Sequence, residues 1–290
     1  MGGTEAFTRM LVDPKLRAPS RQCGQAPPRW LALGRALPGR ARLALAAASF
    51  LAMIALYAWL PDREGASAVV VPTLASIGRA TADALAAREF WVDVQHSFLR
   101  VTAGFAAAAL LAVPLGVLAG AFRSIAALLE PPAEFLRYVP VPALIPLVMI
   151  AAGIGEGAKV LLVFLGTFFQ LLLMTADEVR RVPAHLLHVS QSLGANRREI
   201  VLRVLAPAAL PGIWGALRMC NGWAWSYVVV AELVAATEGL GFRVLRFYRF
   251  IQTPSIYAYL LVLGLLGLGL DWVFRAASRR LFRWTRGAGA

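Results

Sequence analysis

The chain has 290 residues, of which 59% are hydrophobic and only 16% charged, and its mean hydropathy is +0.66. Soluble domains are usually about 45–50% apolar and about 25% charged, so a soluble domain of this size could not bury so much apolar surface. The net charge of +13 comes almost entirely from arginines at the two termini and in one central segment. This is the positive-inside pattern of a membrane protein, and it excludes a nucleic-acid partner, which would require basic and aromatic residues gathered on one folded face.

The polar N-terminal segment precedes the first apolar run. Residues 1–40 are rich in proline, glycine and arginine, with only Glu5 and Asp13 acidic, and they predict a disordered cytoplasmic tail. We expect a transmembrane domain over 41–285 and a short tail over 286–290. Cys23 and Cys220 lie in segments of different character, so no disulfide or metal site is expected between them.

Six apolar segments are candidates for crossing the membrane, since about 20 apolar residues are needed to span the hydrocarbon layer. An all-α fold, a six-helix transmembrane bundle, is therefore expected. The predicted spans are Ala41–Leu60, Val101–Phe122, Val139–Ala152, Ala158–Ala176, Pro207–Val234 and Ile256–Phe274.

The third span is interrupted by Pro140, Pro142 and Pro146. Proline is tolerated within a membrane helix when neighbouring groups satisfy the freed carbonyls. Two interpretations remain open: a kinked helix that faces a solute pathway, or a helix that simply begins at a proline.

The distribution of arginines predicts the orientation. Six spans place both basic termini on one side, the cytoplasm, together with the arginine-rich loop 180–203, while the acidic segment 61–96 falls outside. Within that segment, residues 72–90 predict a surface helix that leads into span two. Three arginines at 243, 246 and 249 contradict the pattern, because they would lie outside.

Small residues recur within the spans. Gly116 and Gly120, and likewise Gly153 and Gly157, form G-x-x-x-G pairs, which allow helix backbones to approach closely. The pairs indicate a packed bundle and no particular function.

Within the central segment 182–211, residues 183–206 predict a cytoplasmic helical hairpin next to span five. Pro183 suits the first turn of a helix, Gly194 suits a left-handed helix end, and Asn196 with Glu199 forms a capping-box pattern for a second helix. We expect that second helix to stop near Pro207. Such a hairpin is suited to docking on a soluble partner, or alternatively to sealing the bundle at its inner surface.

At these residues the sequence resembles the permeases of ATP-binding-cassette importers. Their cytoplasmic loop has the pattern E-A-A, three residues, Gly, nine residues, Ile, one residue, Leu-Pro; here Gly194, Val204 and Pro207 match it, whereas 188–190 and Ala206 depart from it. Further similarity to the nitrate/sulfonate/taurine branch comes from 97–105, 137–147, 153–156 and 225–241, in the same order. The resemblance covers about residues 70–285.

The resemblance implies one half of a homodimer, or possibly a heterodimer, of permease subunits in the bacterial inner membrane. Two ATPase subunits and an extracytoplasmic solute-binding protein would complete it, with a small anion such as a sulfonate, taurine or nitrate as solute. The chain has no G-x-x-x-x-G-K-[ST] loop, so ATP and Mg²⁺ are expected on the ATPase partner, and no enzymatic activity, cofactor or metal is expected on this chain. The residues expected to couple to the ATPase are Ser190, Gly194, Ala195, Arg197, Arg198, Glu199 and Pro207.

Glu232 is an ionisable residue within span five, which by default indicates a functional role. A gate or a structural ion pair, with Arg100 as the partner, is preferred over direct solute contact. Asp271 is expected to pair with neighbouring arginines. The residues expected to line or gate the pathway are Arg100, Pro140, Pro146, Asn221, Trp225, Ser226 and Glu232.

Two other classes of function compete with an importer permease. A stand-alone secondary transporter or channel often has internal repeats and more spans, and no repeat is evident here. A membrane scaffold without transport activity would need neither the proline-interrupted span nor Glu232.

Overall fold

The computed structural model describes residues 38–59 and 71–282, and within these residues the chain is helical, with no strand. Most of the predicted tail 1–40, the tail 286–290 and Cys23 lie outside the described residues. The chain divides into two units, residues 1–62 and 63–290. The first contributes one helix, α2 (Gly39–Trp59), an apolar segment of 21 residues that has no buried side chain.

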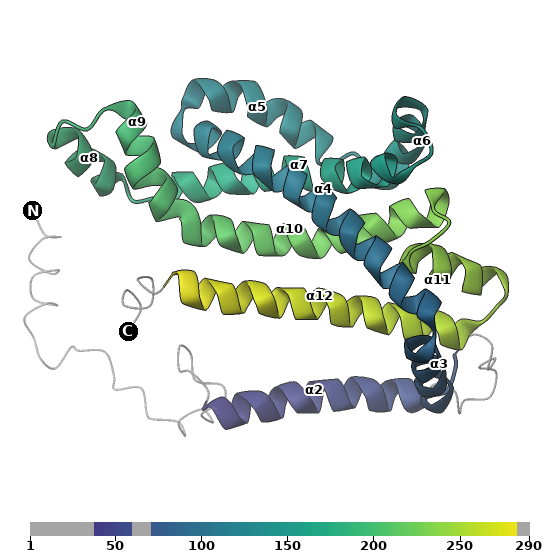
Figure 1. Ribbon diagram of the computed structural model, residues 1–290. Helices are drawn as coiled ribbons and strands as arrows, with labels where there is room; N and C mark the ends of the chain where they lie inside the picture. Colours follow the sequence, from purple (N-terminus) through teal and green to yellow (C-terminus); the bar gives the residue numbers. More distant parts are fainter. Residues whose placement is uncertain (1–37, 60–70, 283–290) are drawn as a thin grey trace, which may run out of the picture. The chain divides into compact units, whose positions relative to one another are not determined.

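The second unit contains the remaining helices, which Figure 1 shows in chain order. They are α3 (Leu74–Ala86), α4 (Arg88–Ala121), α5 (Arg123–Leu136), α6 (Val141–Ala152), α7 (Glu156–Arg180), α8 (Ala184–Ser192), α9 (Arg197–Glu199), the π-helix η2 (Ile200–Leu205), α10 (Ala206–Ala235), α11 (Leu240–Arg249) and α12 (Thr253–Leu281).

Within the described residues, five helical segments are long and apolar enough to cross a membrane: α2, α4, α7, the continuous run from α9 to α10, and α12. The pair α5 and α6 passes the same test only together, and its two helices are bent by 102°. Counted as one broken span, the pair brings the candidate spans among the described residues to the expected six. The predicted third span is therefore corrected: α6 has only 12 residues, about 18 Å of helix, and it needs α5, which the sequence analysis missed.

Helix α4 begins 13 residues before the predicted start of span two at Val101. The polar residues in this stretch made it look like a connecting segment. However, Asp93, Ser97 and Arg100 recur at helical spacing and are all buried, so they form one face of the helix. At 34 residues, or about 51 Å, α4 is longer than the hydrocarbon layer is thick. The helix predicted over 72–90 is present as α3, but it ends at Ala86; the helix is interrupted at Ala87, and residues 88–90 already belong to α4.

Helices α4 and α7 form the most extensive helix pair of the core. A Cβ atom on Gly116 would lie 2.7 Å from the Leu172 carbonyl oxygen, and one on Gly120 would lie 2.7 Å from the carbonyl oxygen of Ala176. The first G-x-x-x-G pair thus allows the close approach that was expected. The second pair does not: nothing lies within 4 Å of a Cβ on Gly153 or Gly157, and Gly153 instead ends α6 with a φ of +76°.

The helix after Asn196 does not stop at Pro207, contrary to the expectation. It continues as η2 into α10, where Pro207 lies in the first turn. Proline has no N–H, and its ring collides with the carbonyl four residues earlier. The wider π turns of η2 directly before Pro207 relieve that collision. The helix therefore continues with a changed hydrogen-bond spacing instead of ending.

Candidate functional site

Two candidate functional regions lie at opposite ends of α10. Figure 1 shows α8 and α9 beside its N-terminal end and α11 beside its C-terminal end. The first end carries the predicted hairpin, and the second carries Glu232 and its partners.

The turn of the hairpin closes with a complete backbone motif. The Ala195 N–H donates to the Ser190 carbonyl at 3.0 Å, and the Gly194 N–H donates to that of Gln191 at 3.0 Å. This pair of bonds, with Gly194 at a φ of +79°, is the Schellman ending of α8. The left-handed turn predicted at Gly194 is therefore present, and Ser190 takes part in it through its carbonyl group.

The start of the second hairpin helix has the predicted capping box. The Asn196 side chain accepts from the Glu199 N–H at 2.9 Å, and the Glu199 carboxylate accepts from the Asn196 N–H at 3.0 Å. Glu199 also lies 3.5 Å from Arg203. Its carboxylate is thus engaged within the hairpin, whereas Arg197 and Arg198 are exposed and make no ion pair with the described residues.

One face of the hairpin packs against the bundle and the other is open. Val182, Ile200, Val201 and Leu205 join a core cluster with Val117 of α4 and Val179 of α7. On α8, in contrast, no residue is buried. Val189 is 57% exposed and Leu193 is 82% exposed, and their spacing of four places them on one helix face.

At the other end of α10, Glu232 has no solvent exposure and three hydrogen-bonding partners. The Ser97 hydroxyl lies 2.8 and 2.9 Å from its two oxygens, Nη1 of Arg100 donates at 2.7 Å, and the Gly241 N–H donates at 2.8 Å. The ion pair expected between Arg100 and Glu232 is present. A carboxylate with these partners is held by the fold, so in this conformation it has no free position for a solute.

Arg100, which is only 3% exposed, joins three segments. Besides Glu232 it donates from Nη1 to the Glu238 carbonyl at 2.7 Å, and from Nε and Nη2 to the Glu156 carboxylate at 2.6 and 2.7 Å. Glu156 is also bound by Lys159 at 2.7 Å. The two-pronged contact with Glu156 is the geometry that only an arginine provides.

The start of α11 is held by side chains from two other helices. The N–H groups of Gly239 and Leu240 donate to Asp93 and Ser97 at 2.8 and 2.9 Å, and Gly241 donates to Glu232. The first N–H groups of a helix have no partner within the helix and favour acidic partners. We call this set the junction cluster; its members are Asp93, Ser97, Arg100, Glu156, Lys159, Glu232, the 239–241 backbone and Arg243.

Arg243 is one of the three arginines that contradicted the charge pattern, and its charge is balanced by an acidic partner. Its Nε donates to Asp93 at 2.7 Å. Burial opposes the charge on Arg243, but the hydrogen bond and the charge of Asp93 outweigh it, so the pKa of Arg243 is raised above its usual value. The junction cluster thereby contains three carboxylates and three cations, and its charge is balanced.

The polar and aromatic residues predicted to line a path on α10 do not gather at one place. Asn221 and Trp225 share the buried face with Glu232, whereas Ser226 is exposed on another face. Pro146 is exposed on α6. Asp271 pairs with Arg218 and Arg275, as expected. A signal that the sequence analysis did not use is the helical spacing of Asp93, Ser97 and Arg100. The structure in addition shows Gly239 at a φ of +122°.

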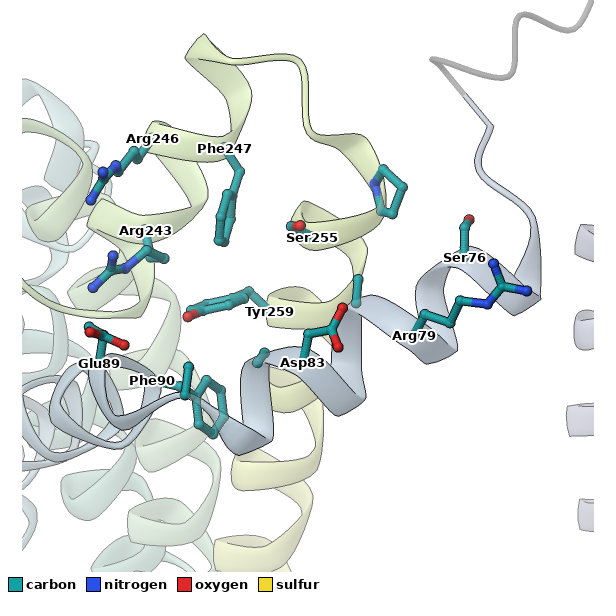
Figure 2. A pocket seen from close by; sticks show the side chains of 14 residues that line it. Ser76, Arg79, Asp83, Glu89, Phe90, Arg243, Arg246, Phe247, Ser255 and Tyr259 are labelled. Atoms are coloured by element: carbon teal, nitrogen blue, oxygen red, sulfur yellow. The ribbon is translucent and has the colours of Figure 1, made fainter.

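A cavity of about 620 Å³ lies beside the junction cluster, between α3, the start of α4, α11 and the start of α12. Figure 2 shows the rings of Phe90, Phe247 and Tyr259 within it. Tyr259 meets both phenylalanines edge-on, with ring centres 5.5 and 5.1 Å apart. The charged side chains that line the cavity are Arg79, Asp83, Glu89, Arg243 and Arg246.

A second cavity, of about 450 Å³, lies at the break between α5 and α6. Arg137, Pro140 and Tyr138 of the break line it, with Phe169 of α7 and Tyr227 of α10. Across residues 38–59 and 71–282, no group of histidine, cysteine and acidic residues is arranged to hold a metal ion.

The fold is shared with chains of a solved transporter. Solved permease chains of the MetNI methionine ABC transporter, in inward-facing conformations, match with a TM-score of 0.52 at 23% and 21% identity. They cover 68% and 72% of this chain, and 94% and 96% of their own length. At this identity the likeness establishes the fold alone.

The sequence establishes the family. Residues 112–283 match the binding-protein-dependent transport system inner membrane component family, and the chain belongs to it. A probable ABC transporter permease of Brucella melitensis is 38% identical over 66% of this chain and 78% of its own. The taurine permease TauC of Escherichia coli is 36% identical over 67% and 70%, and the putative aliphatic sulfonates permease SsuC of Bacillus subtilis is 31% identical over 86% and 91%.

This membership confirms the resemblance and the fold class that the sequence predicted. The chain is a multi-pass inner-membrane permease subunit of an ABC importer. The stand-alone transporter and the scaffold are thereby set aside.

Proposed function

We propose that the chain forms the transmembrane pathway for a small anion of the sulfonate, taurine or nitrate kind. Among its relatives, TauC is named for taurine, SsuC for aliphatic sulfonates and CmpB of Synechococcus elongatus for bicarbonate, the last at 31% identity. All three names describe small solutes with an anionic group. The shared chemistry supports the solute class, while the particular solute differs from one relative to the next.

The observation that carries the mechanism is the continuity of the hairpin with α10. From Arg197 to Val234 the chain is one helical run of 38 residues, so a displacement of the hairpin is transmitted along a stiff element. At the far end of that run lies Glu232, bound to Arg100 of α4 and the start of α11. Motion imposed at the hairpin would therefore reach the junction cluster without passing through a flexible connection.

The open face of the hairpin is suited to an ATPase partner. Val189 and Leu193 offer an exposed apolar strip, and Arg197 and Arg198 lie beside it, free to pair with acidic groups. In this proposal two ATPase subunits bind ATP and Mg²⁺ and dock below two permease subunits, with the hairpin and both termini in the cytoplasm. A solute-binding protein docks at the junction-cluster end, where the cavity of Figure 2 offers charges of both signs.

Coupling between two states requires contacts that differ between them. The junction cluster supplies one set, because its bonds join α4, α7, α10 and α11 in the conformation described here. We propose that it acts as a latch at the outer end, which fits the expected role of Glu232 as a gate or ion pair rather than as a solute contact.

The test is ATP hydrolysis by the complete transporter in liposomes, stimulated by its loaded binding protein. Gly194→Pro should abolish the stimulation, because proline cannot adopt the φ of +79° and lacks the N–H that donates to Gln191. Gly194→Asn is the matched control, since asparagine tolerates the left-handed conformation. Stimulation that survives in Gly194→Pro, with the complex assembled, would contradict coupling through the hairpin.

A further inference from the structure

The break between α5 and α6 holds a cation without an acidic partner. Arg137 caps the end of α5, where its Nη2 donates to the Tyr138 hydroxyl at 2.9 Å. Its guanidinium carbon lies 4.8 Å from the centre of the Tyr138 ring. No carboxylate among the described residues lies within ion-pairing distance of Arg137. Both contacts orient the guanidinium group without neutralising its charge.

The cavity that Arg137 lines lies near the middle of α7, a candidate membrane span. Its far wall includes Gly166 and Phe169 of α7, and α7 begins at Glu156. Ten residues of helix separate Glu156 from Gly166, which is about 15 Å along the axis. This is roughly half of the 30 Å hydrocarbon layer.

An arginine at this depth is costly unless it faces water or another protein group. Arg137 is exposed in the single chain, so the bundle itself does not cover it. The backbone N–H groups of residues 137–139 donate to carbonyls of α5, so it is the charge of Arg137 that requires an aqueous or protein-lined space at the break.

We infer that the cavity at the α5–α6 break is a binding site for the anionic group of the transported solute, with Arg137 as the residue that recognises it. The inference rests on the proposed function. The guanidinium fork matches the oxygens of a sulfonate or carbonate group. Tyr227 and Phe169, which line the same cavity, would contact the organic part of the solute.

The inference also explains the glycine at position 166. A Cβ at Gly166 would lie 2.8 Å from Cε2 of Tyr227, so only glycine leaves room for that ring beside α7. The position of Tyr227 at the cavity wall therefore depends on a residue of the neighbouring helix.

The experiment uses the complete transporter in liposomes, with taurine and bicarbonate as labelled probes. Uptake and binding-protein-stimulated ATP hydrolysis are measured in parallel. Arg137→Gln should lower uptake about tenfold, the usual effect of losing a charge-assisted hydrogen bond, while stimulated hydrolysis stays near the wild-type rate. Arg137→Lys should keep part of the uptake, because lysine retains the charge without the fork.

Arg123→Gln is the matched control, since it removes an exposed arginine from the opposite end of α5. It should leave both readouts unchanged. Unchanged uptake in Arg137→Gln overturns the inference. Loss of assembly in Arg137→Gln, restored in Arg137→Lys, would instead assign Arg137 to an ion pair with a second permease subunit, which also overturns it.

The two proposals fail in different ways. If the wild-type transporter shows stimulated hydrolysis but takes up neither probe nor methanesulfonate, the anionic solute class is wrong and the inference falls with it, while the coupling proposal stands. If the wild type shows no stimulated hydrolysis, the proposed coupling fails first.

Discussion

The two ends of α10 each depend on a glycine with positive φ, but they hold it in different ways. At the hairpin, Gly194 is fixed by backbone hydrogen bonds within residues 190–195, and nothing lies within 4 Å of an added Cβ. At the junction cluster, Gly239 is fixed by side chains from α4, and an added Cβ would lie 2.6 Å from Nη1 of Arg100 and Oε1 of Glu232.

The turn at Gly194 is therefore held by local contacts, whereas the junction cluster is held by tertiary contacts. A local turn keeps its shape when it moves, as a segment that docks on a partner must. A junction that joins four helices holds one arrangement, and its bonds are exchanged together when that arrangement changes. Mutations should therefore have large global effects at the junction cluster and small, local effects at the hairpin.

The largest effect is expected for the buried ion pair. Glu232→Ala leaves Arg100 buried without this partner, and breaking a buried pair from one side usually costs about 3–5 kcal/mol. Unfolding of the detergent-solubilised chain by denaturant measures the loss. The double change Arg100→Gln with Glu232→Gln should cost less than the two single changes combined, because no unpaired charge is left.

The matched control is the half-exposed pair of Arg218 and Asp271. Asp271→Ala should cost about 1 kcal/mol or less, in the range of exposed ion pairs. Equal losses for Glu232→Ala and Asp271→Ala would show that burial does not distinguish the two pairs.

An intermediate effect is expected for the two glycines, compared directly. Gly239→Ala combines an unfavourable φ of +122° with collisions against Arg100 and Glu232, so we expect a loss of about 2–3 kcal/mol. Gly194→Ala meets only the backbone strain, about 1 kcal/mol. The same denaturation measurement ranks them, and a larger loss for Gly194→Ala would reverse the distinction between the two ends.

The smallest effect is expected at the capping box. Asn196→Ala removes the side-chain bond to the Glu199 N–H and should cost about 1 kcal/mol or less. Hydrogen exchange should report it as faster exchange over 197–201 alone. Asn196→Ser keeps a capping oxygen and serves as control; faster exchange that extends to the junction cluster would show that the hairpin is not an independent local unit.

Some features followed directly from the sequence because their causes are local. The Schellman turn at Gly194 and the capping box at Asn196 involve residues within a few positions of each other, so their patterns are visible in the chain itself. The apolar spans were likewise detectable because length and composition determine what crosses a membrane.

Other features depended on contacts that no local pattern contains. Pro140 and Pro142 indicated an interruption. The 102° bend between α5 and α6, however, depends on how both helices pack on α7 and how α6 also packs on α10. Helix α4 runs past its expected start because Asp93, Ser97 and Arg100 meet partners from α7, α10 and α11, up to 150 residues away.

The sequence by itself therefore determined the class of protein, five of the spans and the turn of the hairpin, and it suggested Arg100 as a partner of Glu232. Only the tertiary structure decided that Glu232 is fully bound, that Gly153 and Gly157 do not pack as Gly116 and Gly120 do, and that Arg137 lies beside a cavity that α7 and α10 also line. The physical reason is range: caps, turns and hydropathy act over a few residues, whereas burial and charge compensation depend on which distant helices meet.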